Sequence, residues 1–171
     1  ACALPIGWGE ACRGGLIRGD GGGDLVRIDV HPTAIVAPGA QLADGLSVGP
    51  YSIIGEHVRI GARSQLLSHV VVEGHTRIGE DCTVRNFSNL GGALHHMAYQ
   101  GEPTELVIGD RNQIWEHVTM HIGTVQSGGV TRVGDDGMFM ATSHVGHDCT
   151  VGDNVILAHS ATLGRSDGHT S

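Results

Sequence analysis

Aliphatic residues recur at every sixth position along most of the chain. A helix repeats near 3.6 residues and a half-buried strand at 2, so neither period alone accounts for this spacing. Six is a multiple of two, and glycine often follows the aliphatic residue, so each hexad fits one short strand and one turn. The pattern predicts a parallel β-solenoid with three hexads in each coil of about 18 residues. The aliphatic positions form three runs, in which Phe139 is the one aromatic: Val30, Val36, Leu42, Val48, Ile54, Ile60, Leu66, Val72, Ile78, Val84 and Leu90; Ile108, Ile114 and Met120; and Val133, Phe139, Val145, Val151, Leu157 and Leu163.

The hexads divide the chain into one repeat domain with two interruptions and two irregular ends. Residues 1–27 are rich in glycine and charge, which predicts a disordered lead-in before a solenoid over 28–163. The periodicity is lost near 91–106 and again in a glycine-rich stretch near 121–132. We expect loops there, and long loops in compact repeats are often functional, although a tolerated surface insertion is the alternative. The tail, 164–171, has no hexads; because solenoids normally end in a cap, we expect the chain to be truncated before its cap.

Composition narrows the class of protein. The chain has 171 residues, 40% of them hydrophobic and only six aromatic, which suits one domain with a narrow aliphatic core. A formal net charge of −8 argues against non-specific nucleic-acid binding. No stretch approaches the roughly 20 apolar residues that span a bilayer, and the first residues lack a signal-peptide pattern. We therefore expect a cytoplasmic protein without stable membrane insertion.

The four cysteines have no spacing typical of a metal site. Each aliphatic residue of the six-residue repeat is one rung of the predicted core. Cys82 and Cys149 each lie two positions before a rung, where other hexads have small residues. Cys2 and Cys12 precede the repeat. The sequence predicts buried thiols in a reducing compartment.

Twelve histidines are present, and their phase in the repeat separates them. His144 lies one position before the rung Val145 and points to the opposite side of the strand. His147 lies two positions after that rung, where the first run holds turn and solvent residues. Neither histidine is expected to fill the core. His121 opens the second interruption, and His96 lies in the first.

Three interpretations of these histidines remain open on spacing alone. They are solvated surface residues, or they bind Zn²⁺ through His144 and His147 with His117 or His121. In the third interpretation His147 is a general base that Asp148 orients, because imidazole titrates near neutrality and a carboxylate can hold its ring in place.

The chain resembles the family of bacterial UDP-N-acetylglucosamine O-acyltransferases over about residues 28–163. Both interruptions fall where that family has loops. The resemblance rests on these strings, taken in this order: His31-Pro-Thr-Ala-Ile-Val, Ser68-His-Val-Val-Val-Glu-Gly-His-Thr, Gly101-Glu-Pro-Thr, His121-Ile-Gly-Thr-Val-Gln-Ser-Gly-Gly, and His144-Val-Gly-His-Asp-Cys-Thr-Val-Gly with Asn154-Val-Ile-Leu-Ala.

This resemblance implies a fold, a reaction and partners. The fold is an all-β, left-handed parallel β-helix assembled as a homotrimer, against the usual right-handed crossover rule. The reaction moves a 3-hydroxyacyl chain from acyl carrier protein to the 3-hydroxyl of UDP-N-acetylglucosamine, the first step of lipid A biosynthesis. No metal or redox cofactor is implied, because a thioester is already activated.

The resemblance also implies roles for single residues. His147 matches the general base and Asp148 the residue that orients it, while His121 and His144 match positions lining the substrate cleft. His96 matches a substrate-binding position where the family often has an acidic residue that grips the substrate, so we expect that contact to be altered or replaced.

The family continues beyond this chain, through further coils and a helical domain that carry an oxyanion donor and the floor that measures acyl length. We therefore expect reduced or absent activity from these 171 residues alone. The rival interpretations are another hexapeptide N-acyltransferase, a zinc-dependent hydro-lyase of the γ-carbonic anhydrase type, and an inactive solenoid remnant.

Overall fold

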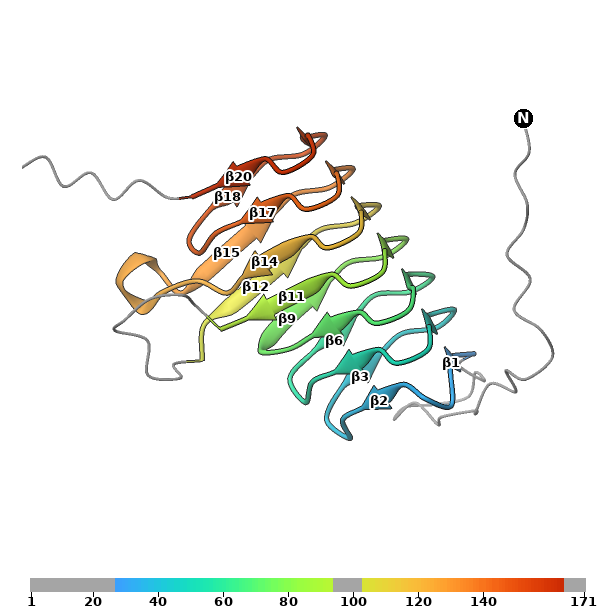
Figure 1. The fold of residues 1–171 in the computed structure, drawn as a ribbon. Helices are drawn as coiled ribbons and strands as arrows, with labels where there is room; N and C mark the ends of the chain where they lie inside the picture. The colour runs from blue at the N-terminus through green and yellow to red at the C-terminus, as the bar shows by residue number, and fades with distance from the viewer. Residues whose placement is uncertain (1–26, 94–102, 165–171) are drawn as a thin grey trace, which may run out of the picture.

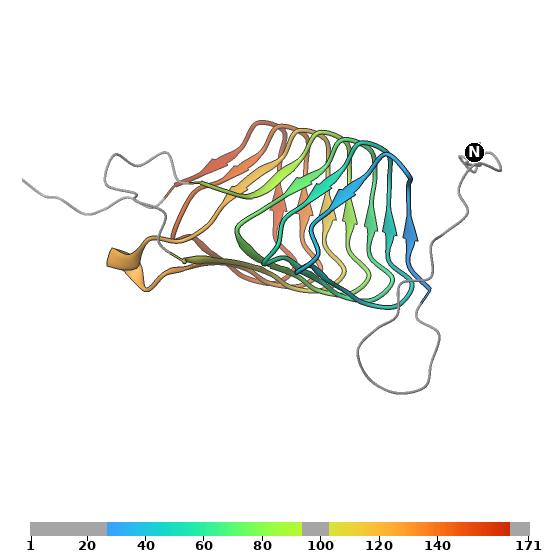
Figure 2. The same cartoon turned by 90° about the horizontal axis from the view of Figure 1, so that it is seen from below.

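The computed structural model describes residues 27–93 and 103–164, which form a parallel β-helix (Figure 1). The chain visits three parallel sheets in turn and returns to the first after each coil. Strands of successive coils pair in parallel register, for example Val84 with Ile114 and Val145 with Leu163. The predicted parallel β-solenoid is confirmed, and Figure 2 shows its coils stacked in sequence order.

The three sheets are named in the order in which the chain visits them. The first sheet contains β1 (Asp29–Val30), β4 (Ser47–Val48), β7 (Gln65–Leu66), β10 (Thr83–Val84), β13 (Gln113–Ile114), β16 (Met138–Phe139) and β19 (Ile156–Leu157). The second contains β2 (Ile35–Val36), β5 (Ile53–Ile54), β8 (Val71–Val72), β11 (Asn89–Gly92), β14 (Thr119–His121), β17 (His144–Val145) and β20 (Thr162–Leu163). The third contains β3 (Gln41–Leu42), β6 (Arg59–Ile60), β9 (His75–Ile78), β12 (Glu105–Ile108), β15 (Val130–Val133) and β18 (Thr150–Val151).

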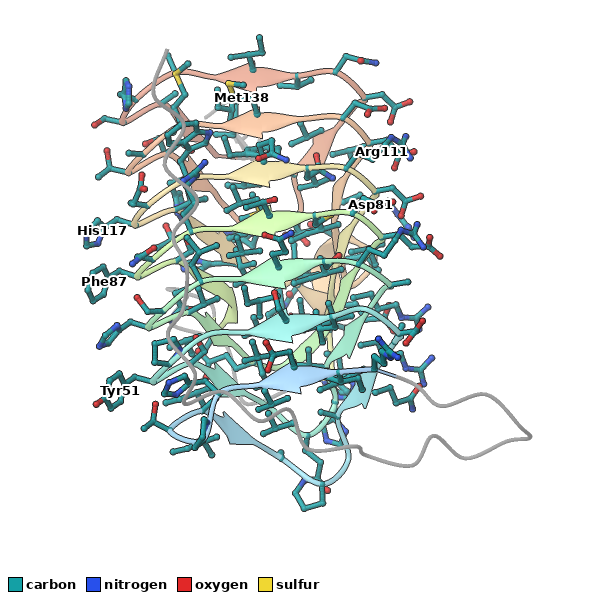
Figure 3. All side chains as sticks on the ribbon, turned by 90° about the vertical axis from the view of Figure 1, so that its right-hand side faces the viewer. Tyr51, Asp81, Phe87, Arg111, His117 and Met138 are labelled. Carbon is teal, nitrogen blue, oxygen red and sulfur yellow. The ribbon has the colours of Figure 1, made fainter. Side chains whose placement is uncertain are left out.

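The turns between sheets form three corners. The first corner leads from the first sheet to the second, the second corner from the second sheet to the third, and the third corner from the third sheet back to the first. Figure 3 shows the first corner as a column that includes Tyr51, Phe87 and His117, with Asp81 and Arg111 of the third corner along the opposite edge. Side chains of successive coils therefore lie above one another at each corner.

The aliphatic rungs fill the interior as the spacing predicts. Leu90, Ile114 and Phe139, in the middle coils, are fully buried. Val30 and Leu163 lie in the first and last described coils and are only partly buried, because within the described residues each has a neighbouring coil on one side alone. Burying a whole aliphatic or phenyl side chain contributes about 1.5–3 kcal/mol before chain entropy is counted, so the ladder drives folding.

Three serines in the core donate hydrogen bonds to the backbone of the next coil. Ser52, Ser64 and Ser88 are buried, and each hydroxyl donates to a carbonyl oxygen 2.8–2.9 Å away. An unpaired buried hydroxyl would cost about 1–3 kcal/mol, so these bonds allow serine in a narrow core. Cys82 shares this phase; it is buried, and burial raises the pKa of its thiol to about 11. Cys149 is only partly buried, unlike the prediction, because it lies beside β18, the last described strand of the third sheet, which has a paired neighbour on one side.

Both interruptions of the repeat arise at the second corner. β11 continues to Gly92 and β12 begins at Glu105, so the ends of the first interruption belong to strands. In the second, His121 still belongs to β14, a 3₁₀ turn spans Val125–Ser127, and β15 begins at Val130. No helix in the described ranges is long and apolar enough to cross a membrane.

Candidate active site

The second corner is where the chain departs from its repeat. His144 lies in β17, and His147 and Asp148 form the turn that leads to β18. The stretch between His121 and Val130 rises from the same corner one coil earlier. A short turn therefore meets a longer loop here, and we call this loop between His121 and Val130 the excursion. The other two corners repeat nearly the same turn in every described coil.

Asp148 occupies a left-handed backbone conformation, with φ of 61°. Left-handed residues recur at the first and third corners, but in the described part of the second corner Asp148 is the one that is not glycine. This conformation costs an ordinary L-residue roughly 1–2 kcal/mol, and aspartate is among the side chains that tolerate it best. The Asp148 N–H donates to Thr131 Oγ1 at 2.9 Å, which helps to hold the turn.

The Asp148 carboxylate is held by two residues. The Thr124 N–H donates to Oδ1 at 2.6 Å, and the Thr124 hydroxyl donates to Oδ2 at 2.7 Å. Oδ2 also lies 2.8 Å from Nδ1 of His147. The Asp148 side chain is only 2% exposed, whereas that of His147 is 27% exposed. The carboxylate is thus enclosed, and the imidazole reaches solvent.

These contacts determine the charge of Asp148. Burial by itself raises the pKa of this carboxyl, but hydrogen bonds from the Thr124 backbone, the Thr124 hydroxyl and His147 outweigh it, so the pKa lies below its ordinary value. An ionised carboxylate only accepts hydrogen bonds, so Nδ1 of His147 must carry the proton between them. In the neutral ring Nε2 then holds the lone pair, the arrangement that a general base requires.

His121 and His144 also meet at this corner. Their rings are in edge contact, with centroids 4.9 Å apart and an interplanar angle of 79°. Nδ1 of His144 lies 2.7 Å from the Thr119 hydroxyl, which belongs to the neighbouring strand. The structure therefore brings together four of the five predicted site residues. The fifth, His96, lies outside the described residues.

The geometry bears on the zinc interpretation. Within residues 27–93 and 103–164, no group of three or more His, Cys, Asp or Glu side chains is placed to hold one metal ion. His117, one of the ligands considered for zinc, lies at the first corner and stacks on Phe87 with ring centroids 5.1 Å apart. It therefore does not join His144 and His147.

Two residues of the site went unnoticed in the sequence. Thr124 and Thr131 lie in the glycine-rich interruption, 24 and 17 positions before Asp148. Only the tertiary arrangement of consecutive coils places them against that carboxylate and its backbone. The sequence signal that could have found them is weak, because threonine is common in loops, where Thr124 lies, and in strands such as β15, where Thr131 lies.

The fold and the site define the class of protein. It is a left-handed parallel β-helix of hexapeptide repeats with a histidine–aspartate pair at the second corner, where the chain departs from its repeat. No family model matches the chain. It is 58% identical over 137 residues to an acyl-[acyl-carrier-protein]–UDP-N-acetylglucosamine O-acyltransferase of Caulobacter vibrioides, and 52% identical over 132 residues to the protein of that name from Saccharophagus degradans. LpxA from Acinetobacter baumannii superimposes with a TM-score of 0.77 at 44% identity, covering 78% of this chain and 52% of that one.

The β-helix described here thus belongs to the family of UDP-N-acetylglucosamine O-acyltransferases. The alignments cover 80% and 77% of this chain. The chain spans about half the length of the curated relatives it matches, 52% and 51%.

Proposed function

We propose that this chain contributes the general base of an acyltransferase that moves a 3-hydroxyacyl group from acyl carrier protein to the 3-hydroxyl of UDP-N-acetylglucosamine, the first step of lipid A biosynthesis. The observation that supports this proposal is the contact between His147 Nδ1 and the enclosed Asp148 carboxylate, which places the lone pair of the neutral ring on Nε2. The names of the relatives supply the acyl donor and the acceptor.

The chemistry follows from that geometry. Nε2 of His147 takes the proton from the sugar hydroxyl as its oxygen attacks the thioester carbonyl carbon. The new C–O bond forms, the C–S bond breaks, and the imidazolium returns the proton to the leaving sulfur. Asp148 stabilises the imidazolium through Nδ1–H and stays ionised throughout. General-base assistance of this kind contributes about 10²–10⁴-fold.

His121 and His144 are proposed to line the substrate cleft. Their edge-to-face contact, and the bond between His144 and Thr119, keep both rings beside the corner that carries His147. Imidazole offers both a donor and an acceptor to a hydroxyl-rich sugar or a phosphate. We assign His96 to the same cleft from the resemblance alone.

A homotrimer is proposed as the working assembly. Large apolar side chains are exposed on the N-terminal coils, including Ile35 and Ile53 on the second sheet and Tyr51 and Phe87 at the first corner. Apolar residues grouped on one side of a protein support contact with further copies of the chain. A cytoplasmic location remains a prediction from the sequence.

The test is acyl transfer by a full-length protein that carries this segment. His147→Ala is expected to lower the rate of transfer from 3-hydroxyacyl carrier protein to UDP-N-acetylglucosamine by about 10²–10⁴-fold. The matched control is His159→Ala, which removes an exposed histidine from the first corner of the last described coil and should leave the rate near wild type. An undiminished rate in His147→Ala would rule out the base, and a similar loss in both variants would point to a structural effect.

A further inference from the structure

Thr124 occupies a position where a threonine hydroxyl ordinarily makes a hydrogen bond to the backbone of its own turn. It is the N-cap of the 3₁₀ turn Val125–Ser127, and a threonine there usually accepts a hydrogen bond from a backbone N–H of the first turn. Here the side chain makes no such bond. Both its hydroxyl and its backbone N–H donate to Asp148 instead. The usual local contact is thus replaced by a long-range one.

The excursion that carries Thr124 is closed at its base. The Gly123 N–H donates to the Glu105 carbonyl at 3.1 Å, and the Glu105 N–H donates to the Gly129 carbonyl at 2.7 Å. The Gly129 N–H donates to the Thr124 carbonyl, also at 2.7 Å. The two ends of the excursion pack so closely that a Cβ at Gly123 would overlap the backbone of Val130. Thr124 is therefore held on a tied backbone, and it is only 6% exposed.

The two oxygens of Asp148 have different duties. Oδ1 accepts from the Thr124 N–H, while Oδ2 accepts from the Thr124 hydroxyl and faces Nδ1 of His147. With both oxygens held, the carboxylate cannot turn about its Cβ–Cγ bond. Without the hydroxyl, a single N–H would be the only contact from Thr124, and the oxygen that faces His147 would lose its partner on that side.

We propose that Thr124 is a positioning residue, whose hydroxyl fixes the Asp148 carboxylate and, through it, the ring of His147. The inference rests on the proposed function of His147 as the base. It also assigns a role to the second interruption of the repeat, because the excursion places the Thr124 hydroxyl against the Asp148 carboxylate of the next coil. Thr131 supports the same turn from below by accepting the Asp148 N–H.

The experiment compares Thr124→Val, which keeps shape and removes the hydroxyl, with Thr124→Ser, which keeps the hydroxyl. In the full-length protein Thr124→Val is expected to lower transfer about 10- to 100-fold, chiefly in kcat, and Thr124→Ser to stay within a few-fold of wild type. The matched control is Thr76→Val. Thr76 is buried like Thr124, but it lies in β9 of the third sheet, and its hydroxyl donates to the Glu73 carbonyl at 2.6 Å, away from His147 and Asp148.

A second readout follows the carboxyl itself. Carbon-13 NMR of labelled aspartate in Thr124→Val is expected to show the pKa of Asp148 rising toward its ordinary value, because one of the bonds that favour the ionised form is gone. The same signal should be unmoved in Thr124→Ser and in Thr76→Val. A hydroxyl that only stabilised the loop would leave this titration unchanged.

The outcomes separate this inference from the proposed function. Wild-type kcat and an unshifted Asp148 titration in Thr124→Val would overturn the positioning role, and so would equal losses in Thr124→Val and Thr124→Ser. If instead His147→Ala retained full activity, the proposed base would fail. The NMR comparison would then still decide whether Thr124 orients the carboxylate.

Discussion

Two corners of the same helix use aspartate in the same backbone conformation for different ends. Asp136 at the third corner and Asp148 at the second have φ values of 57° and 61°. The Asp136 carboxylate lies in solvent and accepts from Arg111 Nε at 2.8 Å and Nη2 at 2.9 Å. The Asp148 carboxylate is enclosed and accepts from Thr124 and His147.

The pKa of each carboxyl lies below its ordinary value, for different reasons. For Asp136 the main cause is the hydrogen bond from the Arg111 guanidinium, a formal charge on a neighbouring coil. For Asp148, burial opposes ionisation, and hydrogen bonds from Thr124 and His147 overcome it. At a corner that follows the repeat, a carboxylate can be paired with an exposed arginine. At the corner that departs from the repeat, a loop can enclose the carboxylate and orient it toward one histidine.

The largest effect should come from neutralising the enclosed carboxylate. Asp148→Asn keeps the shape of the side chain, but it no longer favours the tautomer with Nδ1 protonated, so acyl transfer is expected to fall about 10²–10⁴-fold. Asp136→Asn at the third corner should leave the rate unchanged. Steady-state transfer by the two full-length variants checks this contrast, and equal rates would erase the functional difference between the corners.

Closing the excursion depends on one glycine. Gly123→Ala places a methyl group against the backbone of Gly129 and Val130, so the protein should lose about 1–3 kcal/mol of unfolding free energy. Gly152 belongs to the third corner and has open space where a Cβ would lie, so Gly152→Ala should change stability by less than about 1 kcal/mol. Urea unfolding of both variants measures the difference. A neutral Gly123→Ala would show that the excursion is not tied as described.

Acid should weaken the second corner through Asp148. Because its pKa is lowered in the folded state, its contribution to stability is complete above the unfolded carboxyl pKa of about 3.9 and disappears as pH falls through the lower folded value. The stability difference between wild type and Asp148→Asn should therefore be full near about pH 7 and shrink below about pH 4. Urea midpoints across this range test the sign, and a difference that grew in acid would contradict it.

The smallest effect is expected at the third corner. Arg111 bridges Asp110, Asp135 and Asp136, and the side chains of all four residues are 41–49% exposed. Arg111→Gln should lower the unfolding temperature only slightly, and about 1 M salt should reduce the difference further by screening. Thermal unfolding with and without salt is the measurement. A larger loss of stability that does not depend on salt would contradict the expectation that solvent screens these ion pairs.

Sequence reasoning succeeded where a physical period was present. The rungs from Val30 to Leu163 predict the solenoid because a narrow core accepts an aliphatic side chain only once in each short strand. The string from His144 to Asp148 predicts the pair by its likeness to a family, and the catalytic roles of the two residues stay a prediction. Thr124 escaped notice because its partner lies 24 residues away and its own loop has no period. His117 was weighed as a ligand beside His144, but the two lie at different corners.

The sequence by itself determined the parallel coil and the inward rungs, since a period of six compels strands and turns wherever it holds. Tertiary structure alone decided which loop meets which turn. Stacking of the coils carries Thr124 over Asp148 and sets His121 against His144, and it leaves His117 in a separate column. These contacts depend on where a non-repeating loop lies relative to the next coil. The hexad period carries no information about that position, because the loop does not follow the period.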